Sequence, residues 1–189
     1  PEFADTLIEE AESGRWTLRV LWGSPGQGKS TFLSHVCERL NECNLPFIRH
    51  HYFLDLQDPS DRLSLKSVAH SLMTQMRATK IEMLTQLEDE PENLREWIAT
   101  CGQVYATEGK RFFVLIDGLD HIWRENDGEL APMEALFAQL LPLPPNATLI
   151  LGTQRVDQSK LPRRLNNYLE PEHWVELPRM GLHSVQAWL

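Results

Sequence analysis

The feature that most constrains this chain is a glycine-rich segment near its start, Gly23-Ser24-Pro25-Gly26-Gln27-Gly28-Lys29-Ser30. It fits the pattern Gly-x-x-x-x-Gly-Lys-Ser/Thr, in which the backbone amides of a tight loop surround phosphate groups. The apolar stretch 17–22 before the segment predicts a strand, and apolar residues at helical spacing after it predict a helix. A strand, this loop and a helix in succession distinguish a phosphate-binding loop from a chance glycine-rich turn.

The motif gives its residues separate chemical roles. Its glycines let the backbone turn tightly, without a Cβ between the amides and the phosphates. Lys29 is expected to bridge the β- and γ-phosphates, the Ser30 hydroxyl to ligate Mg²⁺, and Thr31 to reach the α-phosphate. The expected nucleotide-binding residues are Gly23, Ser24, Pro25, Gly26, Gln27, Gly28, Lys29, Ser30, Thr31 and, from a later strand, Thr153.

The order of the apolar patterns predicts the fold class. Strands are expected near 18–22, 47–54, 111–116, 148–151 and 174–177, and helices near 3–11, 29–40, 63–77, 94–105 and 132–141. Strands that alternate with helices in this way predict a doubly wound α/β fold, with a mostly parallel sheet and helices on both faces. The continuous apolar run 111–116 is typical of a strand in the middle of such a sheet, covered on both sides.

Composition excludes several classes of protein. The 189 residues carry a net charge of −9 and scattered basic residues, which argues against nucleic-acid binding by this domain. The longest apolar run, Phe112–Ile116, is far too short to cross a membrane. Three cysteines without a Cys-x-x-Cys spacing suit a reducing cytoplasm, and the seven histidines show no zinc-ligand spacing.

The length predicts one main domain, residues 1–180, with 181–189 as the beginning of a further helical domain. The chain starts at Pro1 and ends within an apparent helix, so we expect it to be a piece of a longer protein. Residues 1–3 also resemble a cloning junction.

Two acidic residues follow the third expected strand. Asp117 ends this strand, where parallel α/β sheets bind nucleotides, and it is therefore expected to hold Mg²⁺ beside Ser30. The other interpretation is an acid that only starts a turn with Gly118. Asp120 is a candidate for orienting or deprotonating the attacking water, or else for capping a helix that begins at His121.

Polar residues also follow the fourth expected strand. Thr153 or Gln154 is placed to sense the γ-phosphate, and Arg155 is a candidate for neutralising its charge, although a solvated loop arginine fits Arg155 equally well. The expected catalytic residues are Lys29, Asp117, Asp120 and Arg155, and the expected metal ligands are Ser30 and Asp117.

With the loop, Asp117-Gly-Leu-Asp120 and Gly152-Thr-Gln-Arg155 in one chain, the sequence resembles the NTPase domain of the STAND class of signal-transduction ATPases, and the NACHT group in particular. The resemblance covers nearly the whole chain. It implies a three-layer α/β P-loop fold with a five-stranded sheet in the order 5-1-4-3-2, which binds ATP or ADP with Mg²⁺. His121 stands where NACHT proteins usually have glutamate, which affects hydrolysis more than binding.

The resemblance also implies a function. Such domains are slow ATPase switches of cytoplasmic signalling or antiviral-defence proteins, in which the nucleotide controls oligomerisation, with effector and sensor domains in the same chain. The alternative is a mechanical ATPase of the AAA+ type, as in origin recognition or remodelling. A small-molecule kinase would need an acceptor pocket and an arginine-bearing lid, and a GTPase would need an Asn/Thr-Lys-x-Asp motif. The sequence offers no clear candidate for any of these three features.

Overall fold

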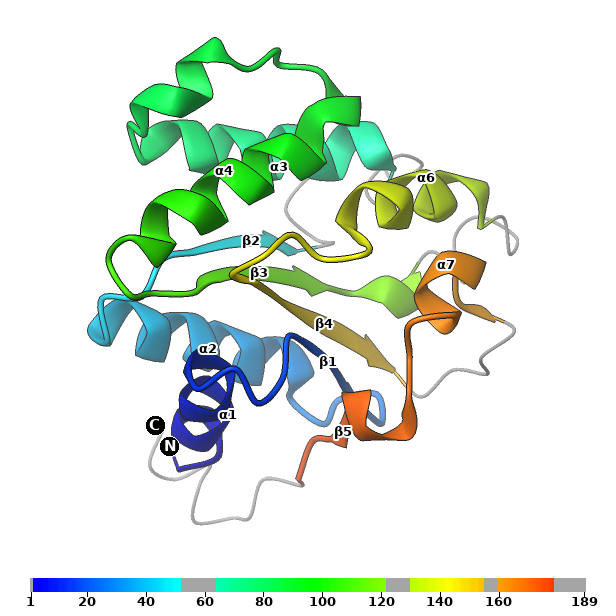
Figure 1. Cartoon of the computed structure of the whole chain (residues 1–189). Coiled ribbons are helices and arrows are strands. Elements are labelled where there is room, and N and C mark those ends of the chain that lie inside the picture. The colour runs from blue at the N-terminus through cyan, green and yellow to red at the C-terminus, as the bar shows by residue number, and fades with distance from the viewer. Residues whose placement is uncertain (1, 52–63, 122–129, 155–159, 179–189) are drawn as a thin grey trace.

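A parallel five-stranded sheet forms the centre of the molecule (Figure 1). The structure, a computed structural model, describes residues 2–51, 64–121, 130–154 and 160–178. The strands are β1 Leu18–Gly23, β2 Phe47–His51, β3 Phe112–Asp117, β4 Ala147–Gln154 and β5 Trp174–Glu176. They lie in the order β2-β3-β4-β1-β5, with every neighbouring pair parallel. Read from the β5 edge, this order confirms the expected 5-1-4-3-2.

Helices cover both faces of the sheet. The helices are α1 Glu2–Glu12, α2 Lys29–Glu42, α3 Leu65–Ala78, α4 Leu94–Ala106, α6 Ala131–Leu140 and α7 Arg163–Asn166, with short 3₁₀ turns at Glu82–Gln86, Pro91–Asn93 and Pro171–His173. In Figure 1, α1 and α2 lie below the sheet, whereas α3, α4 and α6 lie above it. The chain therefore has the three layers of the predicted α/β class. No helix of the described residues is both long and apolar enough to cross a membrane.

The alternation of side chains along each strand supplies two hydrophobic cores. Val114 and Leu149 belong to the core under α3, α4 and α6, whereas Leu115 and Ile150 belong to the core over α1 and α2. Successive strand residues point to opposite faces, so both cores draw on the same strands. All six residues of β3 are buried, as the continuous apolar run predicts.

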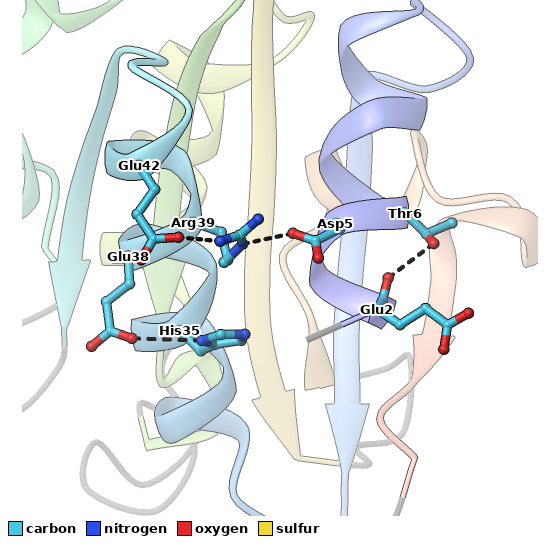
Figure 2. Close-up of polar contacts among 7 residues, drawn as sticks. All are labelled: Glu2, Asp5, Thr6, His35, Glu38, Arg39 and Glu42. Carbon is cyan, nitrogen blue, oxygen red and sulfur yellow. Dashed lines mark hydrogen bonds and ion pairs between the residues drawn. The ribbon is translucent and has the colours of Figure 1, made fainter. Parts of the chain in front are cut away.

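Helix α1 is attached to α2, the helix that follows the glycine-rich loop. Figure 2 shows Arg39 of α2 between the two helices, with its Nε 2.7 Å from Asp5 Oδ1 of α1 and a second contact to Glu42. The rings of Phe3 and Phe32 add an aromatic contact, with centroids 5.2 Å apart. Because of these contacts, α1 belongs to the layer that supports the loop.

Some expected boundaries differ from those in the structure. Strand β4 was expected over 148–151, but it continues to Gln154 because residues 152–154 still pair with the end of β1. Helix α3 begins at Leu65 instead of position 63, because the Ser64 hydroxyl caps it by accepting from Ser67 N at 3.2 Å. The expected residues 52–54 of the second strand, and the helix expected from 181, lie outside the described residues.

Candidate functional site

The glycine-rich loop joins β1 directly to α2. Gly26 and Gly28 have φ angles of 72° and 86°, in the left-handed region that glycine adopts without strain. The helix starts immediately afterwards at Lys29, so its first backbone amides open onto the loop. Lys29 Nζ donates to Gly23 O at 3.1 Å and to Ser24 O at 3.0 Å. The loop thus combines amides, a helix N-terminus and an ammonium group, which together attract anions.

A pocket of about 340 Å³ lies between this loop and the ends of β3 and β4. It forms where parallel strands end, because the carboxyl ends of parallel strands share one edge of the sheet. Its lining residues are Gly26, Gly28, Lys29, Ser30, Thr31, Asp117, Gly118, Asp120, His121 and Gln154. The fold therefore brings the lysine, the hydroxyls and the two carboxylates of the predicted site to one cavity.

Asp117 is the last residue of β3 and is 6% exposed. His51, its partner in the β2–β3 register, places Nδ1 3.6 Å from Asp117 Oδ2. Burial alone would raise the pKa of Asp117, but the neighbouring His51 imidazole, the Ser30 hydroxyl and the Gly118 N–H together outweigh burial, so the pKa lies below its ordinary value of 3.8. Asp117 is therefore an anion at neutral pH beside a hydroxyl, and such a donor set suits Mg²⁺.

Gly152 of β4 makes room for the Asp117 carboxylate. A Cβ on Gly152 would overlap Asp117 Oδ1 and lie 2.7 Å from Leu33 Cδ1 of α2. Glycine inside a strand often marks such a close approach, and this signal was available in the sequence. His51 is a second residue of the site that the sequence did not predict, because its contact with Asp117 depends on the β2–β3 register and not on any spacing of the seven histidines.

Asp120 connects the end of β3 to the end of β4. Residues 119–121 are helical, so Asp120 lies inside a turn of helix, and the interpretation as a cap ahead of His121 is wrong. The Asp120 carboxylate is buried, and its Oδ1 accepts from Gln154 N at 3.0 Å. Gly118 N donates to Gly152 O at 3.1 Å, which draws the same two strand ends together. Asp120 therefore has a structural contact in addition to its place in the pocket wall.

The polar end of β4 presents Gln154 to the pocket, and not Thr153. Side chains alternate along a strand, so Gly152 and Gln154 face the α2 layer with Asp117, whereas Thr153 faces the other side. Thr153 is fully buried, and within the described residues its hydroxyl has no hydrogen-bond partner. Of the two sensing candidates, Gln154 is therefore the one that lines the pocket. Arg155 lies outside the described residues.

Four expected loop residues are not part of the pocket wall: Gly23, Ser24, Pro25 and Gln27. The Gln27 side chain binds elsewhere, since its Oε1 accepts from Ser24 N at 2.7 Å and its Nε2 donates to Leu177 O.

Comparisons with known proteins give one matching family and several similar folds. Residues 17–189 match the NACHT domain family. A Walker-type ATPase of Pyrococcus abyssi superposes with a TM-score of 0.52 at 18% identity, over 80% of this chain and 43% of that chain. A DNA replication initiation factor gives a TM-score of 0.52 at 16% identity, over 99% of this chain and 48% of its own.

The ORC2 protein of Aeropyrum pernix, solved as ADPNP and ADP complexes, also gives a TM-score of 0.52, at 12% identity, over 100% of this chain and 48% of its own. At these identities the likeness shows the fold alone, and the chain spans somewhat less than half of each of these proteins. A comparison with curated proteins found no match.

Proposed function

Since this chain belongs to the NACHT domain family of nucleotide-binding P-loop NTPases, we propose that it binds ATP or ADP with Mg²⁺ and hydrolyses ATP slowly. The observation that carries the proposal is the pocket that joins Lys29, Ser30 and Thr31 of the loop to Asp117 and Asp120. Cationic, hydroxyl and carboxylate groups in one cavity are the groups that phosphoryl transfer requires.

Lys29 and the loop amides bind the phosphates. The ammonium group now lies on the carbonyls of Gly23 and Ser24, and it exchanges them for phosphate oxygens when the nucleotide enters. The first amides of α2 and the positive end of its dipole add to this attraction. A bound phosphate chain would thereby occupy the cavity that the loop shares with the ends of β3 and β4.

Ser30 and Asp117 would hold the metal ion. When bound, Mg²⁺ supplies positive charge that stabilises the oxygens of the transferring phosphoryl group. Asp117 contributes an ionised carboxylate because its pKa is lowered, and Gly152 leaves the space that this carboxylate occupies. Asp120, with Gln154 beside it, orients the attacking water from the same wall of the pocket.

We further propose that the domain, residues 1–180, is the nucleotide switch of a larger cytoplasmic signalling or defence protein, in which the bound nucleotide controls oligomerisation and an effector domain. Family membership supports this role. Residues 181–189 would begin the adjoining helical domain. A mechanical ATPase is the second candidate, because the superposed structures include a replication initiation factor and an ORC2 protein. A switch predicts very slow turnover that DNA leaves unchanged, whereas a mechanical ATPase of that class predicts turnover that DNA accelerates.

Calorimetry of Lys29→Ala with ATP and Mg²⁺ tests the proposed site. Loss of a charge-assisted hydrogen bond to a phosphate should weaken binding about 10- to 100-fold. Lys110→Ala is the matched control, because Lys110 lies two residues before β3, at the opposite end of the strand from Asp117, where it contacts Glu108. Equal affinity of wild type, Lys29→Ala and Lys110→Ala would refute the proposal.

A further inference from the structure

The side chain of Gln27 lies over the first glycine of the loop. Its Oε1 accepts the Ser24 N–H at 2.7 Å, and a Cβ on Gly23 would lie 2.7 Å from that oxygen and 2.9 Å from Gln27 Cδ. Gly23 does not have a positive φ, so the backbone conformation itself would accept another residue. A side chain at position 23 would therefore have to displace the Gln27 carboxamide.

The other end of the same carboxamide binds the end of the sheet. Gln27 Nε2 donates to the carbonyl of Leu177, the residue after β5, while Leu177 N donates to Trp22 O at 2.8 Å. Leu177 is 3% exposed, and the exposed Pro178 that follows it has no N–H to donate. Both backbone polar groups of Leu177 are thus bonded, one to β1 and the other to the phosphate loop.

We propose that Gln27 is a positioning residue that ties the phosphate loop to the end of β5, so that nucleotide in the loop changes how firmly residues 174–178 are held. Ser24 is the shared element, because its N–H binds Gln27 and its carbonyl accepts from both Lys29 Nζ and Gln27 N. A nucleotide draws Lys29 away from Ser24 and fixes the Gln27 backbone on phosphate. The Gln27 side chain then holds Leu177 more firmly at the place where the chain leaves the sheet.

The coupling to nucleotide rests on the proposed function, but the tie between Gln27 and Leu177 does not. Hydrogen–deuterium exchange of the 189-residue chain therefore has two arms. Without nucleotide, the Leu177 amide of Gln27→Ala should exchange about fivefold faster than that of wild type, because one net hydrogen bond contributes on the order of 1 kcal/mol. With saturating ADP and Mg²⁺, amide exchange at residues 174–177 should slow in wild type, and this slowing should be absent in Gln27→Ala.

The controls separate the tie from general loosening. Gln103→Ala replaces an exposed glutamine on α4, so its amide exchange at Leu177 and the other residues of 174–177 should equal that of wild type with and without nucleotide. Gln27→Leu keeps most of the side-chain volume over Gly23 while removing both hydrogen bonds, so faster exchange of its Leu177 amide reports the lost hydrogen bonds and not the gap left by a smaller residue. Equal nucleotide-free exchange of Leu177 in wild type and Gln27→Leu would overturn the tie.

The coupling has its own decisive results. A slowing of amide exchange at residues 174–177 that persists in Gln27→Leu would overturn the coupling, and so would the absence of slowing in a wild-type chain that binds ADP by calorimetry. If calorimetry detects no nucleotide binding, the proposed function fails and the coupling fails with it, while the nucleotide-free arm still decides whether Gln27 holds Leu177.

Discussion

Replacing Gly152 by alanine should damage the proposed metal site and leave the phosphate loop intact. The new Cβ would overlap Asp117 Oδ1 and press against Leu33 Cδ1 at 2.7 Å. Leu33 is buried in α2, so the cheaper response is for the Asp117 carboxylate to turn away from the Ser30 hydroxyl. Lys29 and the loop amides do not depend on Gly152 and should remain in place.

The magnitude follows from two separate effects. Overpacking a buried site costs about 1–3 kcal/mol, which for a chain of this size lowers the thermal midpoint by roughly 2–12 °C. Misplacing a group that orients or supplies a metal ligand reduces metal affinity about 10-fold or more. The ratio of ATP affinity in Mg²⁺ to ATP affinity in EDTA should therefore be about 10-fold smaller in Gly152→Ala than in wild type. The affinity for ATP in EDTA should change less than about twofold.

Calorimetry of ATP binding in Mg²⁺ and in EDTA measures this ratio directly. Gly102→Ala is the matched control, because its Cβ would lie 2.8 Å from Pro145 O, at the opposite end of β4 from the pocket. That variant is also overpacked, so it controls for general destabilisation, and its affinity ratio should remain that of wild type. A wild-type ratio in Gly152→Ala would show that Asp117 does not need this space, and the assignment of the metal site would be wrong.

Three further predictions concern single side chains. Because the pKa of Asp117 is lowered, its ionised form contributes stability that is present above the ordinary value of 3.8 and is lost as the pH falls through the folded-state pKa. The free energy of unfolding, measured by urea titration between about pH 5 and pH 2, should therefore fall less in Asp117→Asn than in wild type. Asp120→Asn keeps an oxygen for the Gln154 N–H and should bind ATP normally but release phosphate about 100-fold more slowly, so a wild-type rate would exclude Asp120 as the water-activating group. Maleimide should label the exposed Cys43 of the native chain, but it should label Cys101 only after unfolding, because burial raises the Cys101 pKa to about 12.

Much of the fold and part of the site could be predicted from local patterns. The run ending at Asp117 predicted a central strand with an acid at its tip, because a strand covered on both faces must be apolar at every position. The motif from Gly23 to Ser30 predicted the conformation of the loop, because the positive φ angles at Gly26 and Gly28 and the start of a helix at Lys29 depend on residues that are neighbours in the sequence.

The details of the site that the sequence did not predict depend on contacts between distant segments. Gln154 lines the pocket and Thr153 does not because β4 continues to residue 154 through its pairing with β1, and side chains alternate along the strand. The contact of His51 with Asp117 needed the β2–β3 register, and the need for glycine at position 152 needed the position of the Asp117 carboxylate. None of these relations has a fixed spacing along the chain.

The sequence by itself therefore determined which chemical groups this protein has and the local structure that carries them: a phosphate loop between a strand and a helix, and an acid at the end of a buried strand. The tertiary structure decided which of those groups share a pocket and which are turned away from it. The physical reason is that backbone conformation and strand alternation are local preferences, whereas the room for a carboxylate at Gly152 and the reach of Gln27 to Leu177 depend on how the packed strands and helices fill space.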